Sequence, residues 1–358
     1  MRLECFFFCT QTGISPRIVL RRTMDNNNTC NINNQVDKYL FPVVYSIVIV
    51  IGIPVNCISL YVACVQVRKK NELAIYLFNL SLADLFYCLI LPLWIDYTSR
   101  GDNWQFSSLL CQISAFIVQT NFYTSAVFLT CISADRYLAL VYPLRFQHLR
   151  SRRCALIVSI FFWALETILN FSVLTHNETF TNVCMFRNYT ICYDKYPMEP
   201  WQARFNIFRI ITGHTIPLTI ILFCYYKIYR VVRRNQATED REKRKIKKLL
   251  LSITVTFIGC FTPYHAVLLI RSIKDSLHMY TIYRIILALT SLNCITDPIL
   301  YCFVSESGRT DILNLFKCCF SMQHTELSQP RTVVVSSTIS KSSRRGTSGD
   351  LCVKLNHL

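Results

Sequence analysis

The chain has 358 residues, of which 52% are hydrophobic and 16% charged, and its mean hydropathy is +0.33. This composition excludes a disordered chain and indicates an integral membrane protein. The formal net charge of +17 is confined to a few loops, so no nucleic-acid partner is predicted.

Residues 1–38 are predicted to form a short tail before the first span. The apolar run Phe6-Phe7-Phe8 is too short for a signal-peptide core, and Arg21-Arg22 follows it instead of preceding it. Met24 opens a polar segment typical of an extracellular tail. Residues 1–23 are therefore interpreted as an upstream extension, and the first span as the membrane-targeting signal.

Seven apolar stretches of membrane-spanning length follow the tail. They cover about residues 39–66, 73–98, 108–141, 152–174, 202–233, 245–272 and 279–303, and roughly 20 apolar residues are enough for one helical crossing. We therefore predict an all-α membrane protein, a seven-transmembrane helix bundle over residues 39–303.

The loops give the orientation of the bundle. Lys and Arg gather after the first span at 68–70, after the third at 145–153, and after the fifth, where Lys227 to Lys248 include ten basic residues. By the positive-inside rule the N-terminus is outside and the C-terminus inside, as expected for a multi-pass protein of the plasma membrane. Three sequons on the predicted outer segments, at Asn27, Asn177 and Asn188, are candidate glycosylation sites.

Four of the 18 cysteines lie on outer segments, where disulfides persist. They are Cys30, Cys111, Cys184 and Cys192, and their spacing leaves three pairings open.

The C-terminal region is predicted in two parts. Residues 304–320 form a short amphipathic eighth helix on the inner membrane lipid, with Cys318 and Cys319 either palmitoylated or left as free thiols. Residues 321–358 have the Ser- and Thr-rich composition of a disordered cytoplasmic tail. This tail is either a simple tether or, once phosphorylated, an anionic segment able to bind a basic partner.

Carboxylates lie inside three of the spans, where each costs about 2.5–3.5 kcal/mol on insertion scales. Asp84, Glu166 and Asp297 fall in the second, fourth and seventh spans. Ionisable groups at this depth normally face the bundle interior and serve function.

Ordered motifs in the spans carry a family resemblance. They are Gly52-Ile53-Pro54-Val55-Asn56, Leu80-Ser81-Leu82-Ala83-Asp84, Cys111, Asp135-Arg136-Tyr137, Trp163, Pro217, Cys260-Phe261-Thr262-Pro263 and Asp297-Pro298-Ile299-Leu300-Tyr301. This set resembles the rhodopsin-like (class A) G-protein-coupled receptors over about residues 39–320. The three acids and the outer runs Leu91 to Tyr97 and Cys192 to Pro197 resemble the proton-sensing branch of that family.

The resemblance implies roles for residues at the inner end of the bundle. Asp135, Arg136, Tyr137, Tyr225 and Tyr301 are expected to form the region that couples to a heterotrimeric G protein, with Asp135 restraining Arg136 at rest. Span six lacks the acid that often pairs with this arginine, and Lys243 stands at about that place. The resemblance also implies that receptor kinases phosphorylate the tail 321–358 and that arrestin binds it.

The resemblance also implies switches and disulfides. Pro217, Phe257, Phe261 and Pro263 are expected to form the activation switch, although most members have Trp where this chain has Phe261. The family pattern pairs Cys111 with Cys192, which leaves Cys30 for Cys184.

Two interpretations of the buried acids stand side by side. In one, a sodium ion is held by Asp84, Asn121, Ser125, Asn293 and Asp297. In the other, Asp84 and Asp297 share a buried site with Glu166 nearby, cannot all ionise cheaply, and take up protons together near extracellular pH. Four histidines are further candidates for proton sensing: His176 and His278 in outer loops, and His214 and His265 in the spans.

The predicted function is a receptor activated by extracellular acidification that raises cyclic AMP through stimulatory G protein. It is not an enzyme, and it needs no cofactor besides protons and the alternative sodium ion. A transporter is disfavoured because no internal repeat is visible, and a retinal pigment because residues 279–303 contain no Lys. The alternative is a receptor for a diffusible lipid or other anionic ligand, which Arg209, Arg271 and Arg284 would bind.

Overall fold

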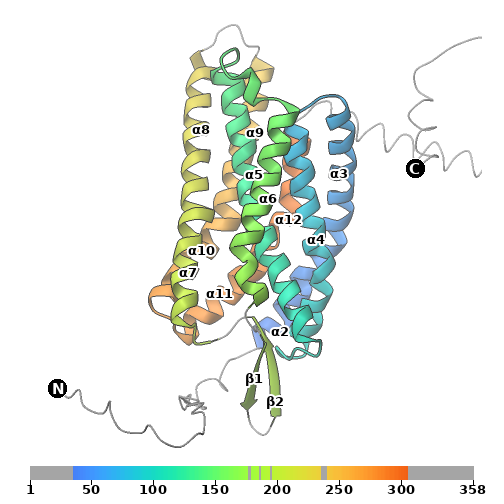
Figure 1. The fold of residues 1–358 in the computed structure, drawn as a ribbon, viewed down its shortest axis with the longest axis vertical. Helices are drawn as coiled ribbons and strands as arrows, with labels where there is room; N and C mark the ends of the chain where they lie inside the picture. The colour runs from blue at the N-terminus through green and yellow to red at the C-terminus, as the bar shows by residue number, and fades with distance from the viewer. Residues whose placement is uncertain (1–34, 176–178, 185–186, 194–195, 235–239, 305–358) are drawn as a thin grey trace, which may run out of the picture.

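The computed structural model describes residues 35–175, 179–184, 187–193, 196–234 and 240–304. Within these ranges seven helical segments are long and apolar enough to cross a membrane. They are Lys38–Arg68, Leu73–Ser99, Ser108–Val141, Arg152–Phe171, Pro200–Arg234, Lys243–Ile273 and Leu277–Pro298. The predicted seven-helix bundle is therefore confirmed (Figure 1).

Four of the spans are built from more than one helical segment. The first span consists of α2 (Gln35–Ile47), η1 (Val48–Gly52) and α3 (Ile53–Arg68), and the fifth of α7 (Pro200–Ile210), η3 (Ile211–Thr215) and α8 (Ile216–Arg234). The sixth span consists of α9 (Asp240–Thr256), η4 (Phe257–Phe261) and α10 (Thr262–Ile273). The seventh consists of α11 (Leu277–Thr290) and α12 (Asn293–Val304). The other spans are α4 (Leu73–Ser99), α5 (Ser108–Val141) and α6 (Arg152–Thr175), with a short 3₁₀ turn, η2 (Gln147–Leu149), before α6.

Proline explains the wide turns in three of these spans. The segments η1, η3 and η4 are π-helical, and each ends two residues before a proline: Pro54, Pro217 and Pro263 respectively. A proline lacks the N–H of the regular ladder and its ring crowds the preceding turn. One widened turn relieves that conflict, and such turns are frequent at functional sites.

A β-hairpin that the all-α prediction does not contain lies at one end of the bundle. Strands β1 (Thr179–Cys184) and β2 (Arg187–Cys192) pair antiparallel, with Thr179 opposite Cys192 and Cys184 opposite Arg187. Figure 1 shows both strands projecting beyond the helices. We call this end of the bundle the disulfide end and the opposite end the Arg136 end.

A disulfide and two backbone contacts fix β2 to the bundle. Cys192 is bonded to Cys111 near the start of α5, as the family pattern predicts. The amide of Trp104 donates to the carbonyl of Thr190 at 2.7 Å, and the amide of Thr190 donates to Oδ1 of Asn103 at 3.2 Å. The loop before α5 is thereby tied to the hairpin.

The third span is the centre of the packing. Helix α5 packs against α4, α6 and α8. Its buried face includes Phe122, Phe128 and Leu129, which join an apolar core with Phe257 and Phe261 of η4. Helix α5 is therefore the element against which several of the other spans are packed.

Several predicted features lie outside the described residues. These are the extension 1–23, the tail to residue 34, Cys30, Asn27, His176, Asn177, the eighth helix with Cys318 and Cys319, and the tail 321–358. For Cys184, Asn188 and Tyr301 the structure describes the backbone but not the side chain. The Cys30–Cys184 disulfide, the glycosylation sites and the palmitoylation sites stay predictions.

Candidate functional site

Two carboxylates from different spans meet inside the bundle. Asp84 on α4 is 0% exposed and Asp297 on α12 is 1% exposed. The two helices pack together, and both carboxylates are enclosed in the interior of the bundle. Nδ2 of Asn121 on α5 donates to Oδ1 of Asp84 at 2.9 Å. The other three oxygens of the pair have no hydrogen-bond partner among the described residues.

Two more polar groups of this cluster also lack a partner in the described part of the chain. They are Oγ of Ser125, one turn after Asn121, and Nδ2 of Asn293, one turn before Asp297. Buried polar atoms nearly always have a partner, so this cluster suits a shared proton, water or a small cation. Its oxygen donors are of the kind that hard cations prefer, and the residues predicted for a sodium ion therefore fit one.

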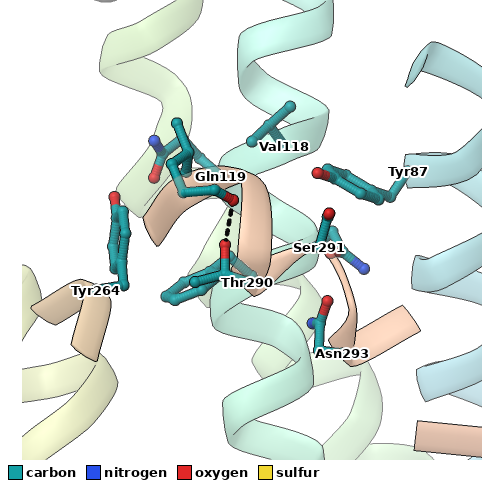
Figure 2. Close-up of a pocket in the computed structure, with 10 residues that line it drawn as sticks. Tyr87, Val118, Gln119, Tyr264, Thr290, Ser291 and Asn293 are labelled. Carbon is teal, nitrogen blue, oxygen red and sulfur yellow. Dashed lines mark hydrogen bonds between the residues drawn. The ribbon is translucent and has the colours of Figure 1, made fainter. Parts of the chain in front are cut away.

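A small cavity adjoins the acids on the side of the disulfide end. It is lined by Tyr87, Val118, Gln119, Asn121, Phe122, Tyr264, Leu287, Thr290, Ser291 and Asn293, and its volume is about 20 Å³. Figure 2 shows Tyr87 and Tyr264 approaching from opposite sides, with Ser291 and Asn293 below Val118. Thr290 donates to the carbonyl of Leu287 at 2.7 Å (Figure 2). The space fits about one water molecule.

A second pocket continues this cavity toward the disulfide end. It is also about 20 Å³ and is lined by Phe41, Tyr45, Trp94, Thr98, Ala115, Val118, Gln119, Tyr193, Tyr283, Arg284 and Leu287. The two pockets share Val118, Gln119 and Leu287. They therefore adjoin each other, and each has room for about one water molecule.

Glu166 has a different set of partners from the other two acids. It is 6% exposed, and Nδ2 of Asn170, one turn later on α6, lies 3.5 Å from its Oε2. Oδ1 of Asn170 accepts from Arg209 on α7, which also donates to Oε1 of Gln119 at 3.3 Å. These contacts place Glu166 with Asn170 and Arg209, and not beside Asp84 as the sequence predicted. Side-chain direction on α6, which sequence spacing leaves undetermined, accounts for the difference.

The two histidines within the spans lie against each other. The rings of His214 on η3 and His265 on α10 stack with centroids 4.6 Å apart. Nδ1 of His265 is 2.8 Å from the carbonyl of Phe261, so this nitrogen carries a proton. Nε2 of His214 is 3.0 Å from Oγ1 of Thr262. His278, in contrast, is exposed at the start of α11.

The two phenylalanines of the predicted switch form one aromatic stack. Phe257 and Phe261 are each 0% exposed, and their rings stack with centroids 5.0 Å apart. Phe261 also contacts Phe122 on α5 at 4.8 Å, while Phe257 stacks on His214. The stack therefore joins the histidine pair to the third span.

The arginines near the disulfide end are already engaged. Arg284 is 2% exposed and pairs with Asp102 at 2.8 Å. Arg271 pairs with Asp275 at 2.9 Å, and Arg209 contacts Asn170 and Gln119 as described above. Two other acids near this end have partners of their own, since Asp96 pairs with Arg100 and Glu199 caps α7. Sequence alone gives no signal for the long-range pair Arg284–Asp102, whereas Arg271 and Asp275 are only four residues apart.

The predicted coupling residues gather at the Arg136 end. Nη2 of Arg136 donates to Oδ2 of Asp135 at 2.7 Å. Tyr137 and Tyr225 pack against a small apolar cluster of Ile228, Val232 and Leu250. At this end Arg136 is therefore restrained by Asp135, and its neighbour Tyr137 packs against residues of α8 and α9.

Comparisons with known proteins agree with this geometry. Residues 55–301 match the family model described as "7 transmembrane receptor (rhodopsin family)". The chain is 52% identical to human G-protein coupled receptor 65 over 326 residues, which are 87% of this chain and 97% of that protein. It is 40% identical to human G-protein coupled receptor 68, covering 84% and 83%, and 33% identical to mouse lysophosphatidic acid receptor 5, covering 77% of each.

Proposed function

Because the chain belongs to the rhodopsin family of seven-transmembrane receptors, we propose that it is a receptor for extracellular protons. Membership implies a multi-pass plasma-membrane protein that signals through a heterotrimeric G protein. In the proposal the disulfide end faces outside, and the G protein is the stimulatory one, which raises cyclic AMP. The Arg136 end is then the coupling surface.

The acid pair is the observation that carries this proposal. Asp84 and Asp297 are buried together, and three of their four oxygens have no hydrogen-bond partner among the described residues. Two carboxylates in one buried site cannot both be ionised cheaply, so their protonation state is sensitive to pH as a unit. We propose that protons reach the acids by way of the two adjoining pockets, the inner of which is lined by Asn121 and Asn293.

A cation is the partner of the acids when they are ionised. A sodium ion at Asp84, Asn121, Ser125, Asn293 and Asp297 would neutralise the charges at high pH, and protons would displace it. The ion and the proton are thus alternative occupants of one site. Glu166 and the stacked pair His214–His265 are further candidates for proton sensing, and their contacts are separate from those of the acid pair.

The alternative ligand class, an anionic lipid, has one specific observation in its favour. A relative of this chain is named for lysophosphatidic acid. The two connected pockets hold about 20 Å³ each, whereas small-molecule sites span about 300–1,000 Å³. The candidate arginines already have partners. Protons are therefore the ligand that this conformation fits best.

One experiment separates the two ligand classes. Cells that express the receptor are placed in lipid-free buffer from pH 8 to pH 6, and cyclic AMP is measured against untransfected cells. Protons as the ligand predict a rise on acidification without any added lipid. A response that appears only when lysophosphatidic acid is added would overturn the proposal.

A further inference from the structure

Asp135 faces two arginines, one on each carboxylate oxygen. Its Oδ2 accepts from Nη2 and Nε of Arg136 at 2.7 and 3.1 Å. Its Oδ1 lies 3.5 Å from Nε of Arg150. Asp135 is only 7% exposed, so its charge depends on these neighbours for compensation.

Arg150 is held in place by contacts that do not involve Asp135. It lies between η2 and α6, and its amide donates to the carbonyl of Gln147 at 3.1 Å. Its Nη2 donates to Oε1 of Glu72, just before α4, at 2.8 Å. Both side chains of that pair are about one-fifth exposed. Glu72 thus fixes the guanidinium beside Asp135.

One donor of Arg150 is unused in this conformation. Its Nε is buried and has no hydrogen-bond partner among the described residues. The separation of 3.5 Å from Asp135 is too long for a good hydrogen bond. A buried donor without an acceptor is costly. A conformation in which Nε of Arg150 moves within hydrogen-bond distance of Asp135 would remove this cost.

Release of Arg136 creates such a conformation. To engage a G protein, Arg136 must leave Asp135, and the buried carboxylate then loses both of its short hydrogen bonds. We propose that Arg150 takes over Asp135 at that moment, so that the carboxylate exchanges one arginine for the other. Arg150 is then a positioning residue that makes the release of Arg136 less costly, a role that rests on the proposed coupling function.

The sixth span makes this exchange more important. Lys243 stands where an acid from span six often restrains the arginine. In this chain the pairing with Asp135 is therefore the main restraint on Arg136 in the described residues. Any contact that stabilises the Asp135 carboxylate after Arg136 has left it shifts the equilibrium toward the conformation that couples to the G protein.

The test is a double-mutant cycle on purified receptor in lipid nanodiscs with stimulatory G protein. Arg150→Met keeps the apolar stem and removes the charge. It is expected to reduce nucleotide exchange about fivefold or more, both at pH 6 and in the basal signal. In the Asp135→Asn background, where no charge needs compensation, Arg150→Met is expected to change nothing further.

Matched variants separate exchange from loop anchoring. Arg150→Lys should restore part of the signal because it keeps the charge. Arg152→Met, at an exposed arginine two residues later, should leave exchange unchanged. An equal loss in both Asp135 backgrounds, or no loss in either, would overturn the proposal. If wild-type receptor ignores acid, proton sensing fails, while basal exchange still decides the role of Arg150.

Discussion

Two carboxylates that share a buried site are stable together only when a proton or a cation lies with them. Asp84 and Asp297 meet this condition, since both side chains are buried and Asn121 donates a hydrogen bond to Asp84. Protons activate the receptor only if the acids hold them more tightly in the active state than at rest. Neutral substitutes for the acids should then act like acid itself.

The first prediction concerns Asp297. Asp297→Asn removes the repulsion with Asp84 and should raise cyclic AMP at pH 8, or move the midpoint of the pH curve toward alkaline values by about half a unit or more. Glu166→Gln should shift the curve in the same direction but less. Because Glu166 has separate partners, the shifts should add in the double variant. A pH curve unmoved in both single variants, at normal surface expression, would mean that these acids are not the sensor.

The second prediction concerns the buried ion pair at the disulfide end. Asp102→Asn removes the carboxylate that faces Arg284, whose side chain is 2% exposed, and should destabilise the receptor by about 3 kcal/mol. The exposed pair Asp96–Arg100 provides a control, because Asp96→Asn should cost no more than about 1 kcal/mol. Thermal unfolding of both variants in detergent gives the comparison. Equal stability of the two variants would contradict the assigned role of Asp102.

At the scale of elements, the proline-linked wide turns place side chains that a regular helix would turn elsewhere. The η3 turn of span five carries Gly213 and His214 toward α5 and α10. A Cβ on Gly213 would come 2.3 Å from the ring of Tyr123, which is 3% exposed. Close approach of these two spans therefore depends on glycine at this position.

The third prediction tests that approach. Gly213→Ala should push η3 away from α5 and lower the free energy of unfolding by about 1–3 kcal/mol, as overpacking does. Surface expression should fall with it. Gly259 lies in the corresponding turn of span six, where an added Cβ would meet nothing within 4 Å. Gly259→Ala should therefore be nearly neutral when both variants are followed by the same thermal unfolding measurement. Normal stability of Gly213→Ala would show that the two spans tolerate separation.

Elements with strong local signals were predictable, and contacts between distant segments were not. Apolar runs of sufficient length located all seven spans, and the family motif identified the partner of Cys111. The hairpin β1–β2 was not predicted because its strands have only six residues each and lie outside the long apolar runs that located the spans. Spacing likewise placed Glu166 near Asp84, whereas Glu166 contacts Asn170 on its own helix, and Asn170 in turn accepts from Arg209 of α7.

At the scale of the whole molecule, the proposed sensor and the coupling surface lie at different depths of one bundle. The acids join α4, α5 and α12, while Arg136 lies near the end of α5 beside α8 and α9. Between them, the stack of Phe257 and Phe261 packs on α5. Both sites can therefore influence one equilibrium between a resting and an active arrangement of the spans.

The last prediction follows from the reciprocity of that coupling. If protons favour the state that binds G protein, then bound G protein must raise the affinity for protons by the same factor. Nucleotide-free G protein should therefore move the midpoint of the acid-induced conformational change toward alkaline pH by about half a unit or more. An environment-sensitive amino acid introduced at position 243 would report this change in purified receptor. Arg136→Ala should keep the acid response yet give the same midpoint with and without G protein. An unshifted wild-type midpoint would mean that the acid pair and the Arg136 end are not coupled.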